Sequence, residues 1–468
     1  MLAAMSCGAL QAAALRNAPK RPNFIFVLLD DMGWRDLGCF GSTFYQTPCI
    51  DRLAAEGMRF TNAYAAAPLC SPTRASIMTG KYPARLGMTH IIQFRPNRKE
   101  KWLQPETARE LPVSEVTIAD ALRRAGYATA SIGKWHLGYE NASAETQGFE
   151  VNIGGSQIAE PPDFFYPAWK GKPAEPGRPY RGVPIEGRPG EYLTDRLTDE
   201  ALRFIETHSN RPFFLYLSHY AVHVPVQAKQ EMIEKYRGRT RAGDPQNNPV
   251  YAAMIESVDE GLGRIIRKLE ALDIGRRTVI ILTSDNGGLD AVDGPHTPAT
   301  SNLPLRMGKL SLYEGGIRVP MIVKWPGAVR PGGVCHVPVI SNDFFPTILE
   351  MAAVRQDPSN PVDGESLAPL LRRKGKPKRD ALYWHYPHVG YNNARPSGAI
   401  RQGDFKLLEF FEDDRIELYH LARDIGEAED LHAKMPQKAV AMRARLHAWQ
   451  QSVGARKLAP NPDFKPAN

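Results

Sequence analysis

The stretch Asn23-Phe-Ile-Phe-Val-Leu-Leu29 is a continuous, mainly apolar run, and it is followed directly by the carboxylates Asp30 and Asp31. A run without polar alternation predicts a parallel strand that is buried on both faces. Adjacent carboxylates after such a strand are costly to bury unless a cation or hydrogen-bond donors compensate them. The stretch therefore predicts a sheet covered on both sides, with a charged site at one edge.

Further strands and helices alternate along the chain after this run. The predicted strands are Tyr127–Ile132, Pro212–Ser218, Thr278–Thr283 and Pro320–Trp325. The predicted helices are Pro48–Ala55, Val116–Arg124, Thr194–His208 and Pro249–Leu272. Such alternation predicts an α/β fold with a large, mainly parallel sheet sandwiched by helices.

A smaller C-terminal unit is predicted after the basic stretch Arg372–Arg379, which we interpret as a linker. Its strands are predicted at Ala381–Tyr386, Ser397–Arg401, Phe405–Phe411 and Arg415–Tyr419, and its helix at Lys434–Ser452. The predicted organisation is a leader or disordered tail at residues 1–20, a large α/β domain at 21–371, and an antiparallel sheet with a helix at 372–468.

Composition and charge exclude some classes of function. The chain has 468 residues and a net charge of +8, which suits an anionic ligand. It has no zinc-finger spacing, basic heptad helix or aromatic RNA-binding signature, so nucleic acid is not an expected partner. No apolar run reaches ~18 residues, so no transmembrane helix is predicted.

The N-terminus and the cysteines leave two alternatives open. Residues 1–14 are mildly apolar and end in small residues, as in a shortened secretory leader, but a disordered tail fits them equally well. On the leader interpretation, the protein is periplasmic or secreted. The five cysteines are too few and odd in number for a disulfide framework, although Cys39 and Cys49 are candidates for one pair.

Four predicted strands end in polar residues, and the carboxyl ends of parallel strands are where such folds bind ligands. These residues are Asp30 and Asp31, Lys134 and His136, His219 and His223, and Asp285 and Asn286. The aspartates and the asparagine offer only oxygen ligands, which predicts Ca²⁺ or Mg²⁺ and disfavours Zn²⁺. Taken alone, Asp285–Gly288 is a plain turn; beside the Asp30–Asp31 pair, a metal site is the better interpretation.

The basic and titratable residues at this edge suit an anion. Lys134 and His136 share one face of an extended segment and are candidates to clamp it. Taken singly, each is more often a solvated lysine or a structural histidine. One of His219 and His223 is also expected to be structural.

The segment Leu69–Gly80 predicts a short helix, with Pro72 in its first turn and Gly80 at its end. Cys70 begins this helix and Arg74 lies one turn further on. A lone cysteine there would be structural. However, Cys70-Ser-Pro-Thr-Arg74, followed by Ala-Ser and closing with Thr79-Gly80, resembles the sulfatase signature.

The resemblance to sulfatases runs from about Arg21 to the C-terminal helix, and it implies a role for each site residue. It implies that a formylglycine-generating enzyme oxidises Cys70 to formylglycine, whose hydrate is the nucleophile. It implies that Asp30, Asp31, Asp285, Asn286 and the modified Cys70 bind Ca²⁺, with Mg²⁺ as the alternative. By the same resemblance Arg74 and His136 contact the hydrated aldehyde, Lys134, His223 and Lys309 hold the sulfate, and His223 protonates the leaving oxygen. Leu310 departs from the small residue expected after Lys309.

The expected substrate is a sulfated carbohydrate, and resemblance to carbohydrate sulfatases favours a galactose or N-acetylgalactosamine sulfate. Two segments are candidates for binding the sugar. One is the aromatic loop Gly155–Gly190, and the other is Tyr383–His388 with Asn392, Asn393 and Arg395, in which His385 is the expected sugar ligand. Trp384 and Tyr386 are expected, on balance, to join the two domains instead. The alternatives are a phosphate or phosphonate ester hydrolase of the wider alkaline phosphatase superfamily, and a non-catalytic binder of sulfated glycan.

Overall fold

The first strand, β1 (Asn23–Leu29), lies inside an eight-stranded sheet in the computed structural model, which describes residues 21–99, 101–172, 181–390 and 394–464. The strand order is β10 (Gly333–Cys335), β2 (Met58–Phe60), β9 (Met321–Lys324), β8 (Thr278–Ser284), β1, β7 (Phe213–Ser218), β5 (Ala128–Gly133) and β6 (Val151–Ile153). Strand β1 pairs in parallel with β7 and β8. Within this sheet, β9 alone runs antiparallel to its neighbours β2 and β8. The predicted large, mainly parallel sheet is confirmed.

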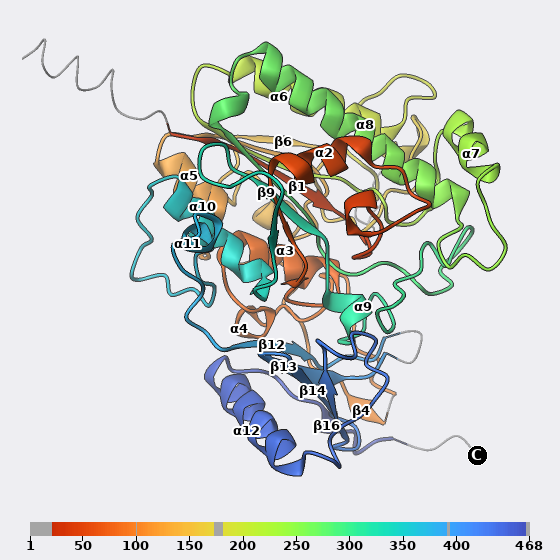
Figure 1. Ribbon diagram of the computed structural model, residues 1–468, viewed down its shortest axis with the longest axis vertical. Helices are drawn as coiled ribbons and strands as arrows, with labels where there is room; N and C mark the ends of the chain where they lie inside the picture. Colours follow the sequence, from red (N-terminus) through yellow and green to blue (C-terminus); the bar gives the residue numbers. More distant parts are fainter. Residues whose placement is uncertain (1–20, 100, 173–180, 391–393, 465–468) are drawn as a thin grey trace, which may run out of the picture.

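Helices cover both faces of this sheet (Figure 1). One face carries α2 (Pro48–Glu56), α6 (Leu193–Thr207), α7 (Gln230–Arg237) and α8 (Pro249–Ala271). The other carries α3 (Cys70–Thr79), α5 (Ile118–Arg124), α10 (Phe344–Met351) and α11 (Ala368–Leu371). The shorter elements are β3 (Ala63–Tyr64), α4 (Pro83–Leu86), β4 (Trp102–Leu103), α9 (Glu314–Ile317), β11 (Val339–Ile340), β16 (Ala459–Pro460) and the 3₁₀ turns Gly38–Phe40, Glu140–Ala142, Ala168–Lys170, Gly275–Arg277 and Ser341–Asp343.

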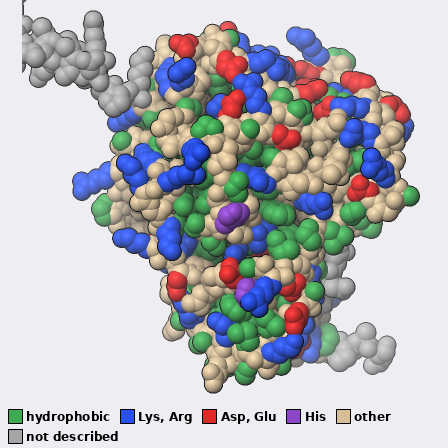
Figure 2. Space-filling model, viewed as in Figure 1, with side chains coloured by type: hydrophobic (Ala, Val, Ile, Leu, Met, Phe, Trp, Pro, Cys, Tyr) green, Lys and Arg blue, Asp and Glu red, His purple; other side chains and the backbone are tan. Residues whose placement is uncertain are grey.

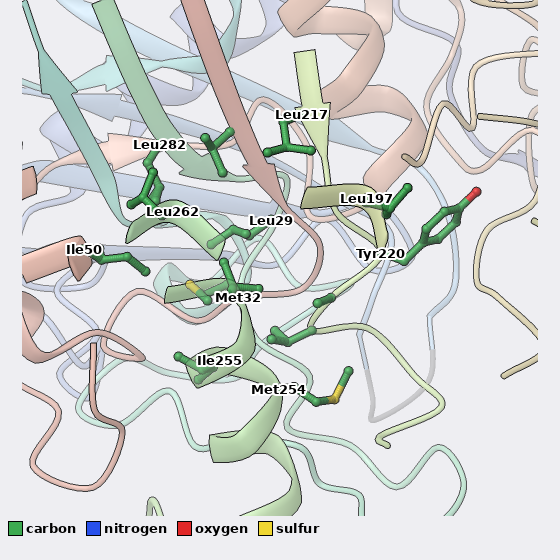
Figure 3. Close-up of a cluster of buried hydrophobic side chains, with 14 of the residues drawn as sticks. Leu29, Met32, Ile50, Leu197, Leu217, Tyr220, Met254, Ile255, Leu262 and Leu282 are labelled. Carbon is green, nitrogen blue, oxygen red and sulfur yellow. The ribbon is translucent and has the colours of Figure 1, made fainter. Parts of the chain in front are cut away.

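The side chains of β1 alternate between two hydrophobic cores. Ile25, Val27 and Leu29 pack beneath α6 and α8, and the residues between them pack on the opposite face. Figure 3 shows the first core, where Leu29, Leu217 and Leu282 from three adjacent strands meet side chains of α6 and α8. Because both faces are buried, the strand has no polar alternation, and this is why its bounds could be predicted from the sequence.

The C-terminal part is a four-stranded antiparallel sheet with one long helix (Figure 1). Its elements are β12 (Ala381–Tyr386), β13 (Ser397–Gln402), β14 (Phe405–Phe410), β15 (Ile416–His420) and α12 (Pro436–Ser452). Its sheet and α12 share a hydrophobic cluster of their own. The predicted boundary after residue 371 falls between α11 and β12, and the division into domains stays a prediction.

A third hydrophobic cluster joins this sheet to the loop before α3. Trp384 is fully buried in it, and its Nε1 donates a hydrogen bond to the Ala65 carbonyl at 2.8 Å. Tyr386 belongs to the same cluster. These two rings therefore join the two parts of the molecule, as the alternative interpretation of this segment expected.

A buried charge cluster crosses the same boundary. Lys406 Nζ on β14 lies 2.9 Å from a carboxylate oxygen of Glu314 on α9 and 2.9 Å from one of Glu427. Arg318 also pairs with Glu314, with Nε 2.6 Å from its Oε2. Two carboxylates share one lysine inside the protein, so the stability of this contact depends on their protonation.

Aromatic residues of the loop Gly155–Gly190 pack into the core of the protein. Phe164 and Trp169 are fully buried, and Trp169 Nε1 donates to the Ile185 carbonyl at 2.9 Å. Tyr180 of this loop, residues 392 and 393, and the predicted leader lie outside the described residues. Cys39 and Cys49 are free thiols, so they do not form the pair left open above. Among the described helices, none is both long and apolar enough to cross a bilayer.

Candidate active site

The carboxyl ends of four neighbouring strands bring most of the predicted site residues together. Asp30 and Asp31 follow β1, Asp285 and Asn286 follow β8, Lys134 and His136 follow β5, and His223 follows β7. Cys70 and Arg74 enter on α3, and Lys309 enters on the loop before α9. All ten are buried. The convergence expected at this edge of the sheet is present in the structure.

Arg74 fastens α3 to the sheet edge. Its Nε donates to Asp285 Oδ2 at 2.9 Å, and its Nη2 lies 2.8 Å from the same oxygen. Its Nη1 donates to the Lys134 carbonyl at 3.0 Å and to Ser218 Oγ at 2.5 Å. One side chain thereby contacts the ends of β5, β7 and β8, and it fixes where Cys70 lies relative to them.

Two lysines pair with the two adjacent aspartates. Lys134 Nζ lies 2.6 Å from Asp30 Oδ2, and Lys309 Nζ lies 2.7 Å from Asp31 Oδ2. Burial raises the pKa of Asp31, but Lys309 and His223 outweigh it and bring that pKa to about 2. Burial raises the pKa of Asp30 well above its ordinary value, and the nearby Asp285 and Asp31 add to that effect against the pull of Lys134.

The oxygen atoms at this edge fit a divalent cation. Single ligand atoms of Asp30, Cys70 and Asp285 lie within 4.8 Å of one another. Asp30 Oδ1 and Asn286 Oδ1 are buried and have no hydrogen-bond partner among the described residues. Oxygens of this kind suit Ca²⁺ or Mg²⁺. A cation would also offset the repulsion between the clustered carboxylates.

Cys70 is present as a thiol, and its Sγ occupies the place of the oxygens that a hydrated formylglycine would carry. Burial raises the pKa of this thiol to about 11, and Asp30 and Asp285 add to the effect against Lys134 and Lys309. A thiol with that pKa is protonated at neutral pH and is a poor nucleophile. The unmodified side chain is therefore unsuited to attack.

His136 is held in one tautomer by a residue that the sequence analysis did not identify. Gln93 Nε2 donates to the Gln157 carbonyl, so Gln93 Oε1 is the atom that faces His136 Nε2, at 2.8 Å. The histidine must therefore carry its proton on Nε2, which leaves a lone pair on Nδ1. Nδ1 is buried and has no hydrogen-bond partner among the described residues. Gln93 lies in an irregular segment, and no sequence pattern marks it.

His223 lies between a cation and a carboxylate. Its Nε2 is 2.8 Å from Lys309 Nζ and 3.4 Å from Asp31 Oδ2. Burial, followed by the charge of Lys309, lowers the pKa of His223 to about 3. His219 is also buried, and burial lowers its pKa to about 4. His219 does not line the pocket described next, whereas His223 does.

A pocket of about 380 Å³ opens onto Cys70, His223 and Lys309. Its outer wall includes His90, Phe94, Glu160 and Asp293, none of which the sequence analysis named. The volume lies within the range of about 300–1,000 Å³ that small-molecule sites occupy. The nucleophile position and two of the predicted sulfate-binding residues are therefore open to one ligand-sized space.

Leu310 lines this pocket with a left-handed backbone, at φ 74°. A residue other than glycine is unfavourable there. Its N–H donates to the Pro68 carbonyl at 2.8 Å, and its side chain is buried in the cluster that joins the two parts of the molecule. Lys309 N donates to the Gly288 carbonyl at 3.1 Å, so the departure at Leu310 leaves Lys309 in the site.

The structure places His385 elsewhere. Its Nε2 donates to the Arg456 carbonyl at 2.7 Å, and its Nδ1 lies 3.3 Å from the amide nitrogen of Gln450 on α12. Both ring nitrogens are engaged, and the side chain is not part of the pocket at Cys70. The sequence predicts a sugar contact for His385 from the polar and aromatic residues around it, and that pattern does not show what packs against the ring.

Comparison with known proteins places the chain in a family. The family model described as Sulfatase matches residues 22–354, and the model described as N-sulphoglucosamine sulphohydrolase, C-terminal, matches residues 307–452. A sulfatase of Formosa agariphila is 32% identical, over 93% of this chain and 89% of that protein. The N-acetylgalactosamine-6-sulfatase of Mus musculus is 34% identical, over 78% of this chain and 69% of that protein.

A solved structure is similar along nearly the whole chain. The crystal structure of Ps i-CgsB in complex with k-i-k-neocarrahexaose has a TM-score of 0.79 and 28% sequence identity, and the match covers 95% of each chain. The resemblance noted at the Cys70 signature is thus confirmed by full-length comparisons. The chain belongs to the sulfatase family and is a hydrolase of sulfate esters.

Proposed function

We propose that this protein removes sulfate from a sulfated carbohydrate, with a formylglycine made from Cys70 as nucleophile and Ca²⁺, or alternatively Mg²⁺, at the oxygen cluster. The observation that carries the proposal is the pocket in which Cys70, His223 and Lys309 share one wall, above the carboxylates of Asp30 and Asp285. Formylglycine would supply a geminal diol in place of the unreactive thiol, and the cation would supply positive charge beside it.

Two lysines balance the charge of the bound sulfate, and an arginine orients Cys70. Lys134 and Lys309 reach the site from two different segments and are held by Asp30 and Asp31. Positive groups fixed in advance around developing negative charge usually make the largest contribution to catalysis. Arg74 is fully engaged by Asp285, the Lys134 carbonyl and Ser218, so it orients Cys70.

The two histidines transfer protons during the reaction. His223 Nδ1 donates to the Val224 carbonyl and its Nε2 accepts from Lys309 Nζ. A proton from Lys309 passes through Nε2 to the leaving sugar oxygen, which is a poor leaving group without it. His136 Nδ1 carries the lone pair that accepts a proton when the ester is broken down to release sulfate. Gln93 keeps that lone pair on Nδ1.

The sugar is proposed to be a galactose or N-acetylgalactosamine sulfate. The support is the similarity to N-acetylgalactosamine-6-sulfatases, of which the mouse protein is 34% identical. The steryl-sulfatase of Mus musculus is nearly as similar, at 33% identity. Overall identity therefore does not identify the group that carries the sulfate, and the residues of the pocket wall must select it.

A substrate panel tests the proposal. Matured enzyme is assayed on 4-nitrophenyl sulfate, galactose 6-sulfate and N-acetylgalactosamine 6-sulfate, and on 4-nitrophenyl phosphate and a phosphonate monoester. The proposal expects sulfate esters to be preferred by kcat/KM. A preference for the phosphorus esters would identify the phosphate or phosphonate hydrolase instead, and binding of sulfated glycan without turnover would identify a non-catalytic binder.

We further propose that a formylglycine-generating enzyme acts on this chain and that the protein is periplasmic or secreted. The Cys70–Arg74 signature supports the first proposal. The second depends on the leader interpretation of residues 1–20. Mass spectrometry of the peptide Leu69–Arg74, and of the mature N-terminus from fractionated native cells, tests both.

A further inference from the structure

The pocket at Cys70 continues into a second, larger cavity. That cavity has a volume of about 680 Å³ and shares Ile91, Ala159 and Glu160 with the pocket at Cys70. Arg95 and Arg181 line this second cavity but not the pocket at Cys70. The second cavity, at about 680 Å³, adds to the pocket at Cys70 a space large enough for a further sugar.

The exposed arginines of this cleft line the outer cavity alone, whereas the exposed carboxylate of Glu160 lines both cavities. Glu160 and Asp293 border the pocket at Cys70, and both are exposed carboxylates. Arg95 and Arg181, also exposed, border only the outer cavity. On the face drawn in Figure 2, basic and acidic side chains are both present, and basic ones gather along the left side. The cleft therefore has exposed carboxylates in the pocket at Cys70 and exposed arginines only in its outer cavity.

This order of charges selects where a substrate carries its acidic groups. Glu160 and Asp293 would repel a second anionic group on the sugar being desulfated, while they accept hydrogen bonds from its hydroxyls. Arg95 and Arg181 attract an anion one sugar further along. Arg95 Nη1 donates to its own Phe94 carbonyl at 2.7 Å, which holds the guanidinium at the cleft wall and leaves its other N–H groups to a ligand.

The walls between these charged groups suit sugar rings. Ile91, Ile158 and Pro162 form apolar surface in the outer cavity, and Tyr139 adds an aromatic ring. Apolar and aromatic walls with a few polar groups are typical of small-molecule sites.

We propose that the outer cavity, defined by Arg95 and Arg181, is a subsite for an acidic sugar that precedes the sulfated sugar at Cys70. The substrate class is then an oligosaccharide or glycan in which the sugar next to the reacting one carries a sulfate or a carboxylate. This inference rests on the proposed carbohydrate sulfatase function and adds the neighbouring sugar to it.

Kinetics with matched oligosaccharides tests the subsite. Three substrates share the same sulfated terminal sugar and differ in the next sugar, which carries a sulfate, carries a carboxylate or is neutral; 4-nitrophenyl sulfate is the fourth. The double variant Arg95→Ala/Arg181→Ala should lose roughly 3- to 10-fold in kcat/KM on at least one acidic substrate. On the neutral oligosaccharide and on 4-nitrophenyl sulfate it should lose less than about 2-fold. The acidic substrate with the larger loss identifies the group. Losing the same factor on all four substrates, or losing nothing on both acidic ones, would overturn the subsite.

Two controls keep the result unambiguous. Arg276→Ala removes the same charge from the opposite edge of the sheet, just before β8, and should leave all four rates unchanged. Calorimetric binding of the three oligosaccharides to the Cys70→Ser protein, with and without the arginine changes, reads the subsite without catalysis. If binding depends on the two arginines but the matured enzyme does not hydrolyse the substrates, the subsite is retained and the proposed function is rejected. If the enzyme hydrolyses the substrates but their binding does not depend on the arginines, the function is retained and the subsite is rejected.

Discussion

Arg74 and Asp285 form a fully buried ion pair in which two guanidinium nitrogens, Nε and Nη2, lie 2.9 and 2.8 Å from one carboxylate oxygen. Replacing one partner of a buried pair leaves the other charge uncompensated, at a cost of about 3–5 kcal/mol. We therefore expect Arg74→Met to lower the free energy of unfolding by about that amount, measured by denaturant titration. The control is Arg98→Ala, which breaks an exposed pair with Glu106 and should cost less than about 1 kcal/mol. A loss below 1 kcal/mol for Arg74→Met would contradict its role in holding α3 to the sheet.

Gln93 fixes the proton of His136 on Nε2, so its removal should reduce activity without unfolding the protein. Residues that orient a functional histidine typically contribute about 10- to 100-fold. We expect Gln93→Leu to lower kcat about 10-fold while the melting temperature changes little. Gln356→Leu, a glutamine of the segment after α10, is the matched control and should keep full activity. Unchanged kcat in Gln93→Leu would show that the tautomer does not matter.

The unpartnered oxygens of Asp30 and Asn286 predict that a divalent cation stabilises the folded protein. Ca²⁺ or Mg²⁺ at 100 times its dissociation constant should add about 2.7 kcal/mol, since it binds the folded state alone. We expect chelation to abolish activity and lower the melting temperature, with add-back restoring both. Asn286→Ala should weaken the stabilisation by added metal. Full activity in metal-free enzyme is the result that would rule out this site.

Glu427 shares Lys406 with Glu314, and its protonation should make stability depend on pH. Burial, together with the charge of Glu314, raises the pKa of Glu427 from 4.5 to about 7, although Lys406 opposes the shift. A carboxyl group whose pKa is raised on folding stabilises the protein fully below pH 4.5, and that contribution is lost as the pH rises through 7. The free energy of unfolding of Glu427→Gln, relative to that of wild type, should therefore increase by on the order of 2 kcal/mol as the pH is raised from 5 to 8.

Denaturant titrations of both proteins at pH 5, 6, 7 and 8 measure that difference. Glu429→Gln provides the control, because Glu429 is exposed and pairs only with the exposed Lys434. A difference between Glu427→Gln and wild type that stays constant over this pH range would mean that Glu427 does not titrate there.

The central strands and the catalytic edge could be predicted from the sequence because they have strong local causes. The run Asn23–Leu29 has the same bounds in the structure, since burial on both faces removes polar residues and makes the strand conspicuous. Asp30, Lys134 and Asp285 directly follow such strands, so a parallel sheet necessarily brings them to one edge. The antiparallel direction of β9 has no local signature, because it depends on the path of the loop that precedes the strand.

The residues that the sequence analysis missed lie where no periodic pattern exists. Gln93, His90 and Asp293 reach the site from irregular segments, and their contacts are formed only after the chain has folded. His385 shows the reverse case. It lies on a correctly predicted strand, but its ring faces α12 and the C-terminal segment, and no sequence pattern indicates what packs on that side.

The burial of Cys70 has a consequence for the order of events in the life of the chain. Cys70 is 1% exposed, and Arg74 in the same signature is fully buried and bonded to three strand ends. An enzyme that oxidises Cys70, as we propose, cannot bind this segment as an extended peptide once α3 has docked, so the proposed modification and folding would compete in time. We expect the folded Cys70 protein to resist conversion by the formylglycine-generating enzyme while the urea-unfolded chain or a peptide of residues 65–82 is converted, as read by mass spectrometry. Equal conversion of folded and unfolded chains would show that α3 opens readily. If only the unfolded chain is converted, the fraction of active enzyme in a cell depends on the rate of modification relative to the rate of folding, and a chain that folds first stays inactive.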